Sequence, residues 1–159
     1  MIHTVSIDPG VNEIGIAAWS GTELAGAALI KKNGDWLSLV RDATSWVLDW
    51  AMDVNIVVIE KPQVYRQHLL KGDPNDLISL AVVVGAIAND FKREWPSVHV
   101  ELLLPREWKG QTPKKVSVER TQRALTAAET RRVELPKTKS LHHNVWDSVG
   151  IGLHWVRGK

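Results

Sequence analysis

The sequence has no cysteine among its 159 residues. Disulfide bonds and thiolate metal sites are therefore excluded, and any bound metal has to be held by oxygen or imidazole ligands. Long apolar runs are missing as well, since no segment approaches the roughly 20 apolar residues that a membrane span needs. Repeats and low-complexity stretches are also absent from the sequence. We expect a cytoplasmic protein that makes no contact with a membrane.

We expect no targeting signal at the N-terminus, because residues 1–4 lead into a predicted strand without a basic region and an apolar core. A chain of this length fits one domain that buries about 70% of its unfolded surface. We therefore expect residues 1–159 to form a single domain.

Two acids each stand at the end of a predicted core strand. Residues 5–19 read as two strands joined by a tight turn at Pro9-Gly10, and Asp8 ends the first of them. The apolar run 56–59 likewise ends in Glu60. Such an acid is often a turn residue that bonds its own backbone. Two carboxylates at core boundaries, however, are costly to desolvate unless positive charge meets them, and a divalent cation is the simplest candidate.

The charge is distributed unevenly along the chain. The net charge is only +2, but residues 1–104 carry 8 Lys and Arg against 13 Asp and Glu, whereas residues 105–139 carry 10 against 4. A run of one charge is most often a solvated face. Beside acids that need a cation, this basic block favours a phosphate backbone as the substrate.

The order of the predicted elements indicates an α/β fold. Three extended segments in succession predict antiparallel strands, and a helix over 35–53 then crosses the sheet to the strand that ends at Glu60. Parallel pairing of that strand with the first would bring Asp8 and Glu60 to the same edge. Further segments predict a helix over 74–95, a strand over 98–104, a helix over 113–132 and a last helix over 141–157.

The helix predicted over 74–95 is apolar nearly all round, so it has to be covered on more than one face. One face can pack on the sheet. The other is either a homodimer surface or part of the core of a monomer.

The last predicted helix carries a third acid. His143, Asn144 and Asp147 project from one helical face, because they are three and four residues apart. Gly150 and Gly152 permit a close approach of this helix to the sheet. A lone Asp near a helix start usually compensates the helix dipole, but this acid is the third at a core boundary.

Three motifs of the chain carry a resemblance to a known family: Ile-Asp-Pro-Gly in the first strand, Ile-Glu at the end of the fourth strand, and His/Asn-x-x-Asp in the last helix. Through them the chain resembles the RuvC-type Holliday junction resolvases, particularly short phage versions. The resemblance extends over most of the chain. It implies an RNase H-like mixed five-stranded sheet, with three antiparallel and then two parallel strands flanked by helices. It also implies a cytoplasmic protein of a bacterium or a phage-infected host cell.

Carried over to this chain, the resemblance makes Asp8, Glu60 and Asp147 catalytic carboxylates that bind Mg²⁺, with Mn²⁺ able to substitute, in a two-metal hydrolysis of a phosphodiester. The family commonly has Asp or His three residues before the last catalytic Asp, where this chain has Asn144. His143, one residue earlier, is either a replacement ligand or a helix-start residue without a role.

The resemblance also implies DNA contacts. Tyr65 stands where the family places an aromatic side chain near the junction point, and stacking on an exposed base there is worth about 1–3 kcal/mol. The basic segment before the penultimate helix is expected to hold phosphates. The expected DNA-binding residues are Tyr65, Arg66, Lys71, Lys109, Lys114 and Lys115.

The sequence thus predicts a homodimeric, Mg²⁺-dependent endonuclease that cuts four-way DNA junctions by paired symmetric nicks. One alternative is another RNase H-like nuclease, such as a YqgF-like RNA-processing enzyme. A second is a module that binds branched DNA without cutting it. An actin-like or sugar-kinase-like ATPase also begins with an Asp-x-Gly hairpin, but it needs two such domains.

Overall fold

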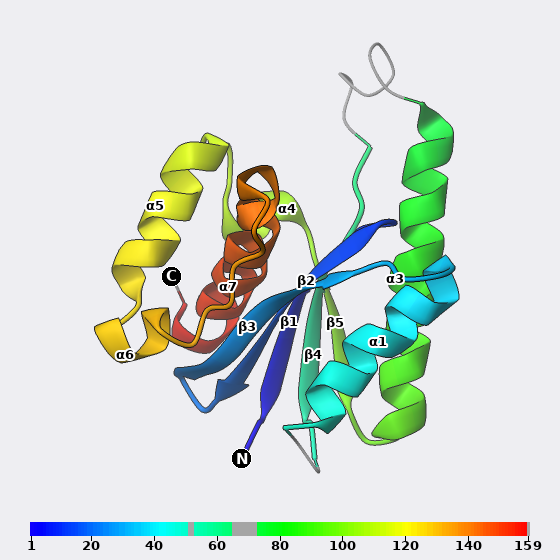
Figure 1. Cartoon of the computed structure of the whole chain (residues 1–159), viewed down its shortest axis with the longest axis horizontal. Helices are drawn as coiled ribbons and strands as arrows, with labels where there is room; N and C mark the ends of the chain where they lie inside the picture. Colours follow the sequence, from blue (N-terminus) through cyan, green and yellow to red (C-terminus); the bar gives the residue numbers. More distant parts are fainter. Residues whose placement is uncertain (51–52, 65–72, 159) are drawn as a thin grey trace.

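The computed structural model describes residues 1–50, 53–64 and 73–158. Its centre is a five-stranded sheet with the strand order β3-β2-β1-β4-β5 (Figure 1). The strands are β1 (Thr4–Asp8), β2 (Glu13–Ser20), β3 (Glu23–Lys31), β4 (Ile56–Glu60) and β5 (His99–Leu103). The first three pair antiparallel, β4 pairs parallel with β1, and β5 pairs parallel with β4. The predicted RNase H-like α/β sheet is confirmed.

Helices cover both faces of the sheet (Figure 1). On one face lie α1 (Trp36–Leu48) and α3 (Pro74–Glu94), and on the other lies α7 (His142–Arg157). The shorter elements on the α7 side are α4 (Pro105–Trp108), α5 (Lys114–Ala124), α6 (Ala127–Thr130) and the 3-10 helix η1 (Lys139–Leu141). No helix in the described part of the chain combines the length and apolar character needed to cross a membrane.

The alternation of side chains along β1 determines which face of the sheet Asp8 lies on. Val5 and Ile7 belong to the apolar cluster under α1 and α3. Ser6 faces the other way, and its hydroxyl donates to the Ser148 carbonyl oxygen of α7 at 2.7 Å. Since successive side chains point to opposite faces of a sheet, Asp8 lies on the α7 face like Ser6.

The same alternation applies to β4. Val57 and Ile59 join the cluster under α1 and α3, whereas Val58 packs with Ile151 of α7. Glu60 follows Val58 by two residues and so also lies on the α7 face. Both strand-end acids therefore face the same helix.

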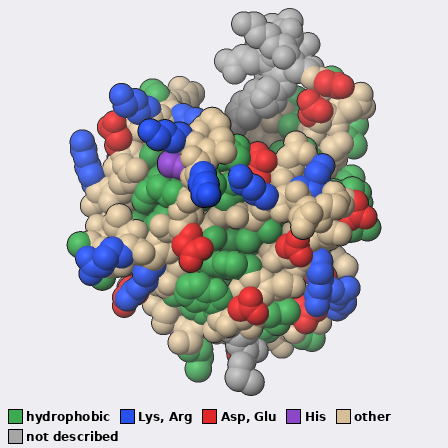
Figure 2. Space-filling model, in the orientation of Figure 1, with side chains coloured by type: hydrophobic (Ala, Val, Ile, Leu, Met, Phe, Trp, Pro, Cys, Tyr) green, Lys and Arg blue, Asp and Glu red, His purple; other side chains and the backbone are tan. Residues whose placement is uncertain are grey.

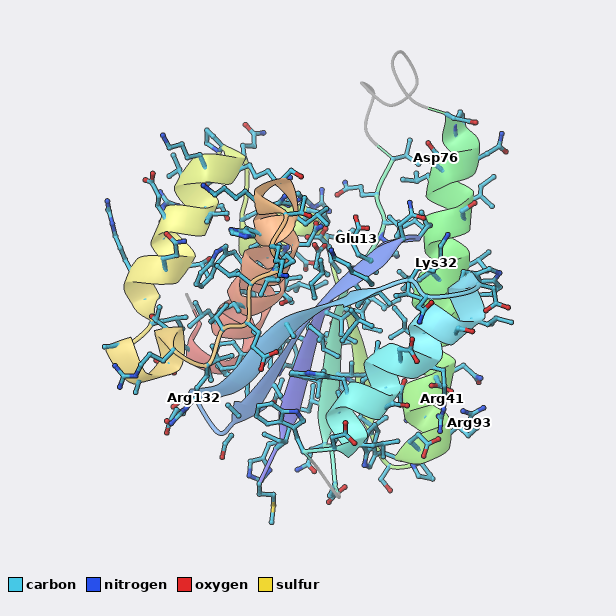
Figure 3. The ribbon with its side chains drawn as sticks, in the orientation of Figure 1. Glu13, Lys32, Arg41, Asp76, Arg93 and Arg132 are labelled. Atoms are coloured by element: carbon cyan, nitrogen blue, oxygen red, sulfur yellow. The ribbon has the colours of Figure 1, made fainter. Side chains whose placement is uncertain are left out.

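The two halves of α3 differ in how they are covered. In the C-terminal half Asp90 is buried and binds two arginines, Arg93 of α3 itself and Arg41 of α1. Figure 3 labels both arginines on these two neighbouring helices. In the N-terminal half Ile78 and Val82 are 62% and 50% exposed. The N-terminal half of α3 is thus an apolar surface left open to solvent.

Residues 113–132, predicted as a single helix, form two. α5 ends at Ala124, and α6 begins after Thr126. The Thr126 hydroxyl accepts the Glu129 amide proton at 3.2 Å, and the Glu129 carboxylate accepts the Thr126 amide proton at 2.9 Å. This capping box starts a new helix and explains the break. The first helix, predicted to reach residue 53, likewise ends earlier, at Leu48.

The buried Glu129 also fastens α6 to the rest of the fold. Its Oε1 accepts the Leu24 amide proton of β3 at 2.8 Å and pairs closely with Arg157 at the end of α7. Arg132, labelled in Figure 3, binds Glu23 beside it. The C-terminal segments are therefore tied to the sheet edge that β3 forms.

Candidate active site

Two of the three predicted acids meet through the pairing of β1 with β4. Ile7 lies opposite Ile59 in the parallel register. The next residue along each strand is an acid, so Asp8 and Glu60 lie side by side at the same end of the sheet. Both face α7, as their positions in the alternation require.

The third acid comes from α7. Asp147 is only 7% exposed and precedes Ser148, whose carbonyl oxygen is bonded by Ser6 of β1. Ile151, one turn further along, packs on Val58 of β4. These contacts place Asp147 over β1 and β4, next to Asp8 and Glu60, so acids from three distant segments converge.

Gly15 makes this approach possible, and its role was not foreseen from the sequence. It lies opposite Asp8 in the pairing of β1 with β2. A Cβ atom at this position would stand 2.0 Å from the Asn144 carbonyl oxygen and 3.4 Å from the Asp8 Cβ. Any larger residue would push the start of α7 away from the sheet. A glycine inside an apolar strand is the signal that points to such a close approach.

Burial and neighbouring charges shift the pKa values of the three acids. Burial raises the pKa of Asp8 well above its ordinary value, and the Glu60 and Asp147 carboxylates raise it further. Burial also raises the pKa of Glu60 and that of Asp147. Lys109 lowers the pKa of all three acids, and Lys114 lowers those of Asp8 and Asp147. The site thus concentrates negative charge that two lysines compensate in part.

Glu60 has two partners from the segment after β5. The Trp108 indole nitrogen donates to its Oε2 at 2.6 Å, and the Lys109 ammonium nitrogen lies 3.8 Å from the same oxygen. Lys109 was predicted to bind phosphate, whereas the contact of Trp108 with Glu60 was not anticipated. The indole is 48 positions away from Glu60 in the chain, so no local pattern could reveal it.

The histidines at the start of α7 separate into two environments. His143 lies close enough to Asp147 to lower the pKa of that carboxyl. His142 instead makes a 2.7 Å hydrogen bond with the Pro136 carbonyl oxygen. Asn144 is half-buried and sits above Gly15, beside Asp8.

The other predicted DNA-binding residues are placed only in part. Lys114 and Lys115 are exposed at the start of α5, and Lys114 is near enough to affect the acids. Figure 2 shows Lys and Arg side chains gathered over α5 and toward α4. Tyr65, Arg66 and Lys71 lie outside the described residues.

The chemistry of the three acids fits a hard divalent cation. All three offer carboxylate oxygens, which Mg²⁺ and Mn²⁺ prefer, and a cation would offset the burial and the carboxylate repulsion that together raise the pKa of Asp8. Across residues 1–50, 53–64 and 73–158, no three His, Asp or Glu side chains are gathered closely enough to hold a metal as they stand. Glu60 is held by Trp108 and Lys109, so side-chain movements would have to complete the ligand set.

We expect Asp8→Asn to raise the free energy of unfolding of the metal-free protein at neutral pH. Because the native pKa of Asp8 is raised, the native state binds a proton at a higher pH than the unfolded chain. Asp8 therefore destabilises the native state above its raised pKa, and this cost fades as the pH falls toward the ordinary value of about 3.9.

Urea unfolding with a chelator present, over a series of pH values, measures this contribution. The native protein should gain more stability on acidification than the variant. A variant that is no more stable than the native protein at neutral pH would contradict an unfavourable charge at Asp8.

Comparison with known proteins gives the fold a name. No family model matches the sequence, and no curated protein matches it. Among solved structures, RuvC of T. thermophilus in complex with a Holliday junction substrate superposes with a TM-score of 0.68 at 16% identity, over 99% of this chain and 95% of that one. A second Thermus thermophilus RuvC structure gives 0.61 at 18% identity, with the same coverage.

The yeast mitochondrial Holliday junction resolvase gives a TM-score of 0.56 at 12% identity, over 98% of this chain and 79% of that one. Identities this low establish the fold alone. The resemblance to RuvC-type resolvases predicted from sequence motifs is thus confirmed as a likeness of structure over nearly the whole chain.

Proposed function

We propose that this chain is a Mg²⁺-dependent endonuclease that resolves four-way DNA junctions by paired symmetric nicks. The observation that carries the proposal is the meeting of Asp8, Glu60 and Asp147, each from a different element, in a fold shared with solved resolvases. Acids whose pKa values are raised by burial, and in Asp8 and Glu60 also by neighbouring carboxylates, are typical of functional sites. One of the similar structures contains a Holliday junction substrate, which supports branched DNA as the substrate class.

In this proposal the three carboxylates hold Mg²⁺, and Mn²⁺ can replace it because it prefers the same oxygen ligands. When bound, the metal supplies Lewis acidity toward the phosphate and lowers the pKa of a bound water. The protein contributes the orientation of the carboxylates. Lys109 stands at the edge of the same site, 3.8 Å from Glu60, where it is suited to bind an oxygen of the phosphate backbone.

The basic surface supports DNA as the partner. Lys114 and Lys115 open α5, Lys114 is near enough to the acids to lower the pKa of Asp8 and Asp147, and both lysines belong to the basic block of residues 105–139. Lys and Arg that neutralise phosphates provide affinity that does not depend on base sequence. Tyr65, Arg66 and Lys71, which follow Glu60 in the chain, remain predicted DNA contacts.

We further propose that two copies associate through the N-terminal half of α3. Ile78 and Val82 are exposed there and line a groove of about 410 Å³ that also includes Trp36. Asp76 and Lys32, labelled in Figure 3, bring opposite charges to the same groove. A two-fold dimer would present one active site to each of two symmetric strands of a junction. Each copy, residues 1–159, would act as a single domain.

A second candidate function is binding of branched DNA without cleavage. It is favoured by Asn144, a neutral residue beside Asp8, and by the lack of a ready-made ligand set among the described residues. A YqgF-like RNA nuclease would share the acids but prefer another substrate. Cleavage assays on a panel of substrates distinguish all three functions.

The native protein should nick a labelled four-way junction at two symmetric positions in the presence of Mg²⁺. It should leave linear duplex, RNA–DNA hybrid and single strands largely intact. Asp8→Asn and Glu60→Gln should lower single-turnover cleavage by at least about 100-fold, because each removes a charge from the metal site. Junction binding, measured by gel shift without metal, should be retained in both variants.

Three results would contradict this proposal. Tight junction binding without cleavage in Mg²⁺ or Mn²⁺ would favour the binding-only module. Preferential cleavage of RNA would favour the YqgF-like alternative. Cleavage by Asp8→Asn at the native rate would show that the carboxylates are assigned wrongly.

Asn144→Asp should raise junction cleavage at least about tenfold and tighten Mn²⁺ binding. Asp has nearly the shape of Asn but adds a charged oxygen ligand, and a lost metal ligand typically costs more than the 1.4 kcal/mol of a tenfold rate change. Junction affinity without metal should stay level or fall slightly, since the new charge would face a phosphate. Single-turnover rates of the two proteins measure the effect. An unchanged rate would indicate that His143 already completes the site.

A further inference from the structure

Trp108 is held between Glu60 and α7. It ends the short helix α4, and its indole nitrogen donates to Glu60 Oε2 at 2.6 Å. The six-membered part of the ring packs against Gly150 of α7, where an added Cβ would stand only 2.6 Å from the Trp108 Cζ3. The indole therefore has little freedom to move without breaking its contact with the carboxylate.

The contacts of Glu60 are asymmetric. Both Trp108 and Lys109 approach Oε2. Within the described ranges, no residue donates a hydrogen bond to Oε1. One oxygen of this carboxylate is thus engaged, and the other is left for a further partner.

The indole N–H of Trp108 also differs from a charged donor in its effect on the Glu60 carboxylate. An indole N–H is neutral and donates one hydrogen bond, so it orients a carboxylate without neutralising it. Lys109 also approaches Oε2, but its flexible ammonium fixes no single direction. Trp108 can therefore remain in place when a cation arrives at the other oxygen.

We propose that Trp108 is a positioning residue that holds Glu60 by Oε2 so that Oε1 is presented to a divalent cation together with Asp8 and Asp147. This inference rests on the proposed function, because it assigns Trp108 a role toward the metal site proposed there. Gly150 contributes to this placement of Trp108, since only a residue without a side chain leaves space for the indole beside α7.

Trp108→Phe tests this role, because it keeps an aromatic ring and removes the N–H donor. We expect the affinity of the metal-free protein for Mn²⁺, measured by titration calorimetry without DNA, to fall about tenfold. Loss of a hydrogen-bond partner to a metal ligand typically costs 10- to 100-fold, roughly, in affinity. At saturating Mn²⁺, junction cleavage by the variant should return close to the native rate.

Trp155→Phe is the matched control. Trp155 packs in the same apolar cluster as Trp108, with Val58 and Ile151, and within the described part of the chain it donates no hydrogen bond to the three carboxylates. Its replacement should leave Mn²⁺ affinity unchanged even if both variants lose a similar amount of stability to urea. If Trp108 had a purely structural role, the two variants would have similar Mn²⁺ affinities.

Gly150→Ala tests the contact between Trp108 and Glu60 in a second way. The added methyl group would displace the indole, so this variant alone should also weaken Mn²⁺ binding. In the Trp108→Phe background the smaller ring leaves room for the methyl group, and Gly150→Ala should cause no further loss. Such non-additivity is expected of two changes that break one interaction.

The outcomes separate the two proposals. If the native protein binds Mn²⁺ and cuts junctions while Trp108→Phe binds Mn²⁺ as tightly, the positioning role is wrong and the proposed function stands. Equal losses in Trp108→Phe and Trp155→Phe would also overturn the positioning role. If the native protein neither binds Mn²⁺ nor cuts junctions, the proposed function fails and the inference fails with it.

Discussion

The cost of holding three carboxylates close together, one buried and two partly buried, is the constraint on which this site depends. Asp8, Glu60 and Asp147 lie where burial and mutual charge raise the pKa of Asp8, so the fold carries an arrangement that is unfavourable in itself. Lys109 and Lys114 compensate part of the charge. Strained or repulsive groups persist where the surrounding structure holds them and a ligand benefits. A divalent cation is the ligand that would turn this repulsion into binding energy.

The rest of the fold keeps α7 in the position that this arrangement requires. The Trp19 indole donates to the Ser6 hydroxyl, which in turn donates to the Ser148 carbonyl oxygen. A Cβ at Gly152 would stand 2.1 Å from the Trp19 indole nitrogen, so the helix lies directly on this side chain. At its far end α7 is held by the pair of Arg157 with Glu129. Asp147 therefore stands on a rigid element, as a preorganised site needs.

Much of this could be predicted from the sequence, because alternation and helical spacing are local patterns. They indicated the parallel pairing that brings Asp8 and Glu60 to the same edge of the sheet, and the position of Asp147 on the last helix. The contact of Trp108 with Glu60 depends on packing between distant segments, so no local pattern reveals it. The Thr-x-x-Glu pattern that begins at Thr126 is typical of a capping box and could have predicted the break. The helical pattern instead predicted one continuous helix over residues 113–132.

The most direct test of the central claim is the location of a bound metal in crystals of the native protein soaked in MnCl₂, from anomalous scattering of manganese. The account predicts an anomalous peak among the carboxylates of Asp8, Glu60 and Asp147, and no such peak in Asp8→Asn crystals treated in the same way. Manganese bound elsewhere, with these carboxylates empty in a protein that cuts junctions in Mn²⁺, would contradict it.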